Sequence, residues 1–517
     1  MIPKNWTRAD WLNLIIFAAL VVVFYWRILT PNLADRQSFP PGDFSAQFWA
    51  FTTFEVRELS AGRLPLWNPY TFAGAPFWAD VQSAVFYPPS LLTLLLSAPW
   101  GFSLFALEIE AVVHFWLAGG LMYLFIRRVT GHRPAAFIAA LTFTFSGYLS
   151  GYPGQQLAVL EADVWLPLIL FFIHQARERM GEWANERMAL TKDDSPPHTS
   201  PIPSLLLAGI AWGLTLLAGH PQSALIIAYI STAYLIFLWL TPLPALRRST
   251  LYNFLRALRH AALFLATGLA LAAIQFLPAI EYTRLSVRAA GAYDKMSGGF
   301  PLTDLIQLLL PGQVSLYSPL YVGVVGLLLA VWVALAAPTK HTVFWGLVAA
   351  ITLLMTFGGN TFLYSPLYLV APGMSIFRGQ ERWALATAFS LSVLAGYGFR
   401  QLTMNNDQLT MNNDQLSTPA EHALRNTKHE TRNTFYVLRF TQYLFLFALL
   451  LDFLFFYGLN DAGWNPASPF FGLLGASTLL TILLALAGLL WTFAPRLPPA
   501  LFTGLTAALI CFDLFTA

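Results

Sequence analysis

The sequence predicts an all-α, polytopic membrane protein with about 13 transmembrane helices (range 11–14) and a long first extracytoplasmic loop that carries an interfacial helix. Hydrophobic residues make up 57% of the 517 residues and charged residues only 11%, whereas a soluble domain has roughly 25% charged residues. The apolar residues fall in runs of about 17 to 25, the length at which a helix spans a hydrocarbon core. Lipid is therefore the expected solvent.

Charge and cysteine content exclude several classes of function. The formal net charge is +3, and the Lys and Arg residues are scattered, so nothing indicates a nucleic-acid-binding surface. The single cysteine, Cys511, lies in an apolar run, which excludes an internal disulfide and a cysteine-based metal site.

Each predicted span is an apolar run bounded by polar, Gly or Pro residues. The first run is too long for a signal-peptide core and lacks a cleavage pattern, so we expect it to be retained. The predicted spans are 11–29, 103–126, 134–150, 157–175, 203–219, 222–240, 261–280, 320–337, 342–357, 383–399, 437–458, 470–493 and 499–516.

The loops between these spans predict the orientation. With the N-terminus in the cytoplasm, 20 of the 29 Lys and Arg residues fall on the cytoplasmic side and 9 on the outer side. An odd number of spans places the C-terminus outside. The last apolar run ends at Ala517 without a polar tail, as expected of a chain truncated before an outer domain.

The chain divides into three predicted parts. Residues 1–400 form a transmembrane catalytic module with the outer loop 30–89, and residues 437–517 form C-terminal transmembrane helices. Between them, 401–436 contains a tandem seven-residue repeat without apolar a and d positions, so we interpret it as a cytoplasmic low-complexity insertion rather than a coiled coil. The charged segment 176–203 is interpreted as a linker.

The outer loop is too long for a turn and is where we expect the chemistry. Phe44, Phe48 and Phe51 share one face of a predicted helix over 44–59 that lies in the headgroup plane. Asp43 precedes this helix after Pro-Pro-Gly, so it can cap the helix or present a carboxylate at the membrane surface. The rest of the loop is rich in Pro, Gly and aromatic residues, which predicts an ordered, non-helical lid or platform.

Several motifs together resemble a known family, the YfhO-like bacterial membrane proteins within the C-type glycosyltransferases. The strongest are Gly42-Asp43 followed by Gln47, PLWNPYTFAG at 65–74 and ADVQSAVFYPP at 79–89. Weaker ones are GHPQ at 219–222, LLLPG at 308–312, YVG at 321–323 and FRGQERW at 377–383. The resemblance covers most of the chain apart from the repeat insertion.

This resemblance implies a function and a location. It implies an enzyme of the bacterial plasma (inner) membrane, with an extracytoplasmic active face, that moves a sugar from a polyprenyl-phosphate donor to an envelope glycan or glycolipid acceptor. An acidic residue of the first outer loop is the expected catalytic group. Longer relatives carry an outer domain after the last span that this chain lacks.

The chemistry of such a donor gives independent reasons for choosing site residues. A lipid-linked sugar needs cations near the headgroup and a carboxylate slightly further out. Asp43 is the first choice for a general base that takes the proton of the acceptor hydroxyl. Asp80 is the second, either orienting Asp43 or binding sugar hydroxyls, with turn formation as the structural alternative. Gln47 and Gln82 accompany them in the same motifs and are expected to bind substrate.

Arg378 and Arg382 are the predicted phosphate ligands. They are four residues apart just before a span, so a helix would place both on one face at the outer boundary. A guanidinium can contact phosphate through two parallel hydrogen bonds. The alternatives are snorkelling to the interface or pairing of Arg378 with Glu381, which we also assign to the substrate site. Arg284 and Arg288 have the same spacing and are a weaker choice.

Other polar groups lie beside or within the spans, where ionisable residues are costly and often functional. Glu161 and Asp163 could line a sugar cavity, as could Glu108 and Glu110, although their shallow positions also allow simple exposure to water. His220 and Gln222 occupy a tight outer turn that could bind a sugar hydroxyl or phosphate. His114 lies deeper and is expected to make a helix-to-helix hydrogen bond.

No phosphate-binding loop, dinucleotide motif or metal motif occurs in the sequence, so a nucleotide sugar is not expected as the donor. A divalent cation between Asp43 and Asp80 is the one cofactor that the carboxylates allow. The rival classes are a lipid or solute transporter, for which repeated halves are expected but not found, and a non-catalytic envelope assembly factor.

Overall fold

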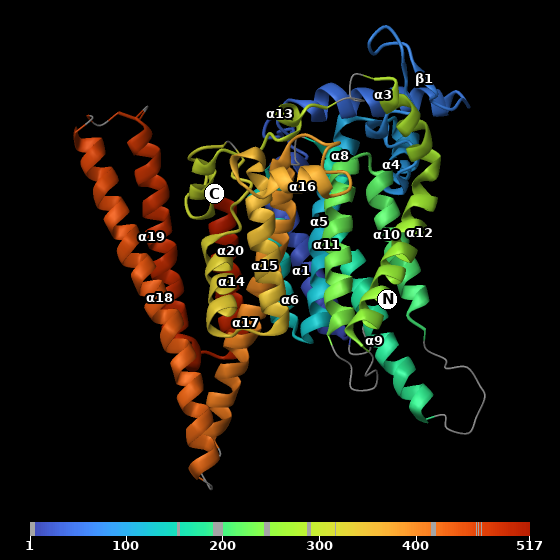
Figure 1. Cartoon of the computed structure of the whole chain (residues 1–517). Helices are drawn as coiled ribbons and strands as arrows, with labels where there is room; N and C mark the ends of the chain where they lie inside the picture. The colour runs from blue at the N-terminus through green and yellow to red at the C-terminus, as the bar shows by residue number, and fades with distance from the viewer. Residues whose placement is uncertain are drawn as a thin grey trace.

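The computed structural model describes residues 6–151, 156–189, 200–241, 249–286, 291–315, 317–414, 420–461, 463, 465–466 and 468–516, without the side chains of 184–189 and 405–438. Helices make up most of it (Figure 1). The strands in this part of the chain are β1 (Trp67–Asn68) and β2 (Ala75–Pro76), which pair antiparallel with Trp67 opposite Pro76.

Helices lie at all thirteen predicted span positions. They are α1 (Arg8–Phe24) with α2 (Trp26–Leu29), α5 (Leu104–Thr130), α6 (Arg133–Thr144) with α7 (Gly147–Ser150), α8 (Leu157–Asp163) with α9 (Leu166–Ala189), α10 (Ile202–Leu217), α11 (Pro221–Leu240), α12 (Thr250–Arg284), α14 (Val324–Ala336), α15 (Lys340–Thr356), α17 (Ala384–Asp414), α18 (Ala420–Asp461), α19 (Pro469–Phe493) and α20 (Pro499–Thr516). Within the described residues, seven helical segments are long and apolar enough to cross a membrane, and three shorter ones are also apolar. The predicted all-α, multi-pass membrane class is therefore confirmed.

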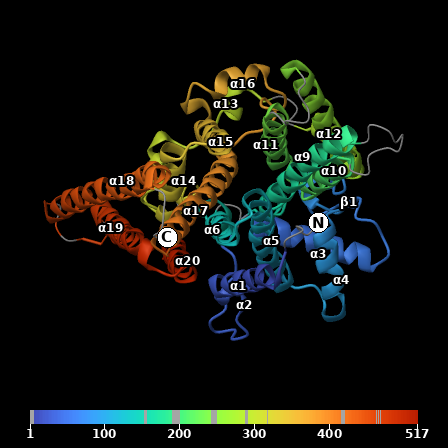
Figure 2. The same ribbon diagram turned by 90° about the horizontal axis from the view of Figure 1, so that it is seen from below.

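The centre of the bundle is built from α5, α6, α14, α15 and α17, which lie side by side (Figures 1 and 2). Glycines allow close approach there: a Cβ at Gly326 of α14 would lie 2.8 Å from Thr142 Cγ2 of α6. Aromatic rings fill the remaining space, with Phe389 packed edge-on against Phe143 at 5.3 Å. Such packing replaces the hydrophobic effect, which does not drive helices together in lipid.

The C-terminal hairpin of α18 and α19 stands apart from this centre (Figure 1). The Asp452 carboxylate of α18 holds it together by accepting hydrogen bonds from Ser477 Oγ at 2.5 Å and Thr481 Oγ1 at 2.8 Å, both in α19. In the repeat region, which the sequence analysis interprets as a low-complexity insertion, α17 continues as a helix to Asp414 and α18 begins at Ala420. The predicted linker 176–203 is partly the end of α9, and 190–199 lie outside the described residues.

At one end of the bundle the outer loop forms a crosswise layer. It contains the π-helix η1 (Phe44–Phe48), α3 (Trp49–Ser60), the 3-10 turn η2 (Val81–Ser83) and α4 (Pro88–Ser97). Helix α3 lies across the helix ends (Figure 1), and Phe44 and Phe48 of η1 are buried. Gln275 of α12 anchors the loop by donating to the carbonyl oxygens of Trp78 and Asp80 at 2.7 and 3.1 Å.

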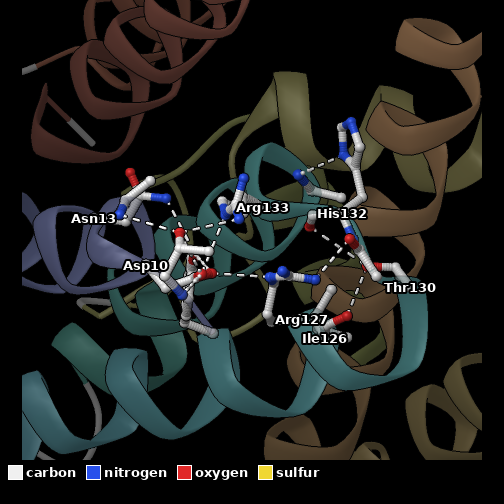
Figure 3. Close-up of polar contacts among 12 residues, drawn as sticks. Asp10, Asn13, Ile126, Arg127, Thr130, His132 and Arg133 are labelled. Atoms are coloured by element: carbon white, nitrogen blue, oxygen red, sulfur yellow. Dashed lines mark hydrogen bonds and ion pairs between the residues drawn. The ribbon is translucent and has the colours of Figure 1, made fainter. Parts of the chain in front are cut away.

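At the other end of the bundle, a buried ion-pair cluster holds α1 against α5 and α6 (Figure 3). The Asp10 carboxylate accepts hydrogen bonds from Arg127 Nε at 2.9 Å and Arg133 Nε at 3.1 Å. Tyr123 Oη donates to the same carboxylate at 2.9 Å. One acidic side chain therefore balances two guanidinium groups where three helices meet.

Candidate functional site

The Asp43 carboxylate does not cap the helix that follows it. The backbone of Asp43 is already helical, the NH of Ala46 donates to Gly42 O instead, and no NH of η1 donates to the Asp43 side chain. Oδ2 accepts a hydrogen bond from Gln156 Nε2 at 3.1 Å, just before α8. The capping interpretation was therefore wrong, and this exposed carboxylate points toward residues of distant segments.

Gln156 connects Asp43 to a guanidinium. Its Oε1 accepts from Arg382 Nη2 at 3.4 Å, and Arg382 Nη1 donates to Gln222 Oε1 at 3.2 Å. Gln222 in turn donates from Nε2 to Gly379 O at 3.0 Å. Three predicted site residues, Asp43, Gln222 and Arg382, thus belong to one hydrogen-bonded network.

The Arg382 guanidinium forms no ion pair with a carboxylate of the described residues. Within the described part of the chain, no carboxylate lies within ion-pairing distance of Arg382, and its buried Nε has no hydrogen-bond acceptor. Its other contacts are to amide and carbonyl oxygens, including Arg378 O at 3.1 Å. A positive group held only by neutral oxygens is suited to binding an anion.

Arg378 and Arg382 do not share a helical face. Gly379 lies between them in the left-handed region, at φ 78°, and the 3-10 turn η7 (Gln380–Trp383) begins after it. The prediction of a common face was wrong because this glycine breaks the helix. The Arg378 side chain is exposed, Glu381 is half-buried, and Arg288 of the weaker pair lies outside the described residues.

His220 and Asp163 lie on the buried side of the same region. His220 Nδ1 is 2.8 Å from Ser223 Oγ, and the Asp163 carboxylate accepts from Tyr148 Oη at 2.9 Å. Burial lowers the pKa of the His220 imidazole well below its usual value, and the Arg382 charge lowers it further. Both effects favour the neutral form of His220, which serves as a hydrogen-bonding group.

The outer-loop motif 79–89 packs onto this turn. Gln82 Oε1 accepts from Gln47 Nε2 at 2.9 Å, so these two predicted residues contact each other. Gly219 has a φ of 87°, and a Cβ there would lie 2.5 Å from Val81 O, so a side chain would separate the two segments. Asp80 accepts from Gln82 NH at 3.0 Å and caps η2, which is the structural alternative foreseen for it.

The acidic residues near the outer ends of the spans are not exposed to water, contrary to one of our expectations. Glu108, Glu110, Glu161 and Asp163 are all buried. They also do not form one set: Asp163 bonds Tyr148, whereas Glu110 and Glu161 both accept from Ser90 Oγ, at 2.6 and 3.4 Å. The expected hydrogen bond of His114 is present, to Tyr87 Oη at 2.8 Å.

A pocket lies between α3, η2, α4, α5 and α8. Its polar lining consists of Thr52, Glu55, Gln82, Ser83, Ser90 and Glu161, and its apolar lining includes Phe48, Phe51 and Leu107. Burial and then the charge of Glu110 raise the pKa of Glu55 to about 8. Of the predicted site residues, Gln82 and Glu161 line this pocket.

Sequence reasoning missed Gln156, Ser90 and Glu55. Gln156 is a neutral side chain in a loop, and Ser90 follows Pro88-Pro89 with nothing to mark it as functional. Glu55 is followed by two more charged residues, Arg57 and Glu58, and nothing in the sequence separates it from them by charge alone. The signal that could have separated it is its spacing of i+4 from Phe51, which places it on the buried face of the interfacial helix.

Comparison with known proteins gives structural neighbours but no sequence relatives. No protein-family model matches the chain, and no curated protein matches it, so the YfhO-like resemblance rests on the motifs alone. ArnT from Cupriavidus metallidurans, bound to undecaprenyl phosphate, is 12% identical over 99% of this chain and 77% of its own, with a TM-score of 0.48. The archaeal oligosaccharyltransferase AglB from Archaeoglobus fulgidus, in complex with an inhibitory peptide and a dolichol-phosphate, is 15% identical over 83% of this chain and 55% of its own, with a TM-score of 0.41.

Proposed function

We propose that this protein is a membrane glycosyltransferase that moves a sugar from a polyprenyl-phosphate donor to an envelope glycan or glycolipid acceptor, with Asp43 as general base. The observation that carries the proposal is the network in which Gln156 joins the Asp43 carboxylate to the Arg382 guanidinium. A lipid-linked sugar presents its phosphate and its anomeric carbon next to each other. A cation and a base separated by one side chain suit that substrate.

Asp43 is suited to accept a proton. Oδ2 is held by Gln156, and Oδ1 has no hydrogen-bond partner among the described residues. In the proposed step, Asp43 takes the proton of the acceptor hydroxyl while that oxygen bonds to the anomeric carbon. The bond from this carbon to the phosphate oxygen breaks, and its electron pair leaves with the polyprenyl phosphate.

Arg382 is suited to hold the leaving phosphate. Its guanidinium carries a charge that no described carboxylate neutralises, and Gln156 and Gln222 hold it from two sides. Phosphate charge increases as the glycosidic bond breaks, so a fixed cation stabilises the transition state more than the bound donor. Gln222 and His220 then provide neutral hydrogen-bonding groups for the phosphate or sugar.

The position of the network favours a lipid-linked substrate. Asp43 directly precedes the π-helix η1, whose Phe44 and Phe48 are buried, and α3 continues across the ends of the spans (Figure 1). An interfacial helix lies at the depth of lipid headgroups. We assign this end of the bundle to the extracytoplasmic side because the distribution of Lys and Arg places the outer loop there.

The test is sugar transfer by the purified protein in lipid vesicles, with a panel of polyprenyl-phosphate sugars and crude envelope acceptors. We expect Asp43→Asn to lower the rate by at least about 100-fold. The control is Asp35→Asn, an exposed carboxylate of the same outer loop whose hydrogen-bond partner among the described residues is Asn32. Equal rates in Asp43→Asn and wild type would refute the assignment of the base. Movement of labelled lipid or solute across the bilayer without transfer would favour a transporter.

A further inference from the structure

A second buried cluster lies on the inner side of the pocket, apart from the Asp43 and Arg382 network. Glu110 and His114 are separated by one helical turn on α5, and Glu161 faces them from α8. Each of the three offers a ligand atom within 4.8 Å of the other two. All three side chains are at least nine-tenths buried.

The two carboxylates of this cluster form no ion pair in the part of the chain that the structure describes. Among the residues that the structure describes, no Lys or Arg lies within ion-pairing distance of Glu110 or Glu161. Both carboxylates contact the Ser90 hydroxyl, and the Glu161 side chain also hydrogen-bonds Glu110. Glu55 adds a third buried carboxylate to the wall of the same pocket. Uncompensated carboxylates are costly to bury, so either protons or a cation must balance them.

The hydrogen bonds of His114 favour a cation. Nδ1 lies 2.8 Å from the Glu110 carbonyl oxygen, which can only accept, so Nδ1 carries the proton and Nε2 presents a lone pair. Metal-binding histidines are held in the same way, with the other ring nitrogen donating to a carbonyl or carboxylate. The imidazole therefore brings a nitrogen lone pair to a group whose ligand atoms lie within 4.8 Å of one another. A bound cation uses that lone pair, whereas a proton shared by the two carboxylates does not need it.

Tyr87 can release this nitrogen to an ion. Its hydroxyl lies 2.8 Å from His114 Nε2, and a second acceptor, Glu161 O, lies 3.2 Å away. Trp165 Nε1 donates to the Tyr87 oxygen at 2.9 Å and holds it in place. When an ion takes Nε2, the Tyr87 hydroxyl can turn to the Glu161 carbonyl, so no buried polar group is left unpaired.

We infer that Glu110, His114 and Glu161 form a binding site for one divalent transition-metal ion, of the class that imidazole and carboxylate ligands favour, such as Zn²⁺ or Mn²⁺. One nitrogen and two carboxylates supply three protein ligands. Glu161 and Ser90 also line the pocket, so the fourth position is open to water or to a substrate oxygen. This site differs from the divalent-cation site between Asp43 and Asp80 that the sequence analysis considered. It does not depend on the proposed transferase activity.

The experiment measures metal on the full-length protein in detergent or nanodiscs, after stripping with chelator and addition of Zn²⁺ or Co²⁺. We expect about one ion per chain in wild type, and affinities lowered by about 100-fold or more in His114→Gln and Glu161→Gln. The matched control is Glu108→Gln, another buried carboxylate of α5 that is not part of the cluster, and it should bind like wild type. Size-exclusion profiles establish that each variant is folded.

X-ray absorption at the zinc edge tests the ligand set on the wild-type chain, even if the variants fail to fold. The expected shell contains one imidazole nitrogen and otherwise oxygen. A wild-type chain that binds no ion would overturn the inference in favour of a proton shared by the two carboxylates. Binding that His114→Gln and Glu161→Gln leave unchanged, or a shell without imidazole, would overturn it by placing the ion elsewhere.

Discussion

Asp43 and Arg382 are far apart in the sequence but are joined by one side chain, Gln156, which donates to Asp43 Oδ2 at 3.1 Å and accepts from Arg382 Nη2 at 3.4 Å. The contact fixes the distance between a carboxylate and a guanidinium without allowing them to neutralise each other directly. A base and an anion site can therefore coexist in one network. The first two predictions follow from this arrangement.

Removing Gln156 should weaken transfer through Asp43. In Gln156→Ala the carboxylate loses its one described partner, so we expect kcat to fall between about 10- and 100-fold through misplacement of the base. If Gln156 acts by positioning Asp43, the double variant Asp43→Asn, Gln156→Ala should be no slower than Asp43→Asn alone. Losses that multiply in the double variant would show that Gln156 acts independently of Asp43.

The two arginines of the predicted phosphate site should differ. Arg382→Lys keeps the charge but cannot reach Gln156, Gln222 and Arg378 O at once, so we expect the donor KM to rise at least about tenfold. Arg378→Lys is the matched comparison, because that side chain is exposed and makes no hydrogen bond or ion pair among the described residues. Equal effects of the two substitutions on KM would contradict the assignment of the phosphate to Arg382.

Hydropathy was sufficient to locate the helices but not to orient their polar groups. A chain in lipid must satisfy its backbone hydrogen bonds internally, so apolar runs predict helices reliably. Whether Glu110 and Glu161 face water or the interior depends on helix rotation. Apolar content does not show that rotation, and both were expected to be as accessible to water as to a cavity, whereas both are buried.

Some residues of the candidate site were predicted from the sequence, but their connections were not. Asp43 and Arg382 were chosen for their chemistry, and both are in the network. Their predicted local geometry failed in each case because it assumed regular helix: η1 is a π-turn, and Gly379 interrupts the turn before Arg382. Gln156 could not be found because a neutral amide in a loop carries no signal until the fold brings distant segments together.

Glu55 predicts a pH dependence of stability. Its folded pKa is raised from 4.5 to about 8, so the folded protein binds this proton more tightly than the unfolded chain does. The contribution of Glu55 to the free energy of unfolding should therefore be largest below pH 4.5. It should decrease as the pH rises to about 8 and then level off, with a total loss of a few kcal/mol. Thermal unfolding of Glu55→Gln in detergent should show a flatter dependence across this window. If Glu55→Gln leaves the slope of stability against pH unchanged, Glu55 has an ordinary carboxyl pKa in the folded protein.

The Asp10 cluster (Figure 3) lies at the end of the bundle opposite the outer loop. A substitution there should therefore change stability and not transfer. Asp10→Asn removes the one acidic group that Arg127 and Arg133 share, and Arg127 is itself buried. Breaking a buried ion pair by removing one partner typically costs about 3–5 kcal/mol, because the other charge stays buried without compensation. Thermal unfolding in detergent should therefore shift downward by several degrees, whereas Asp294→Asn, an exposed carboxylate, should leave it nearly unchanged. If both variants unfold with wild-type stability, the ion pairs contribute little. Helix α1 is then held by its apolar contacts, such as the Phe17 ring packed directly on Gly119 of α5.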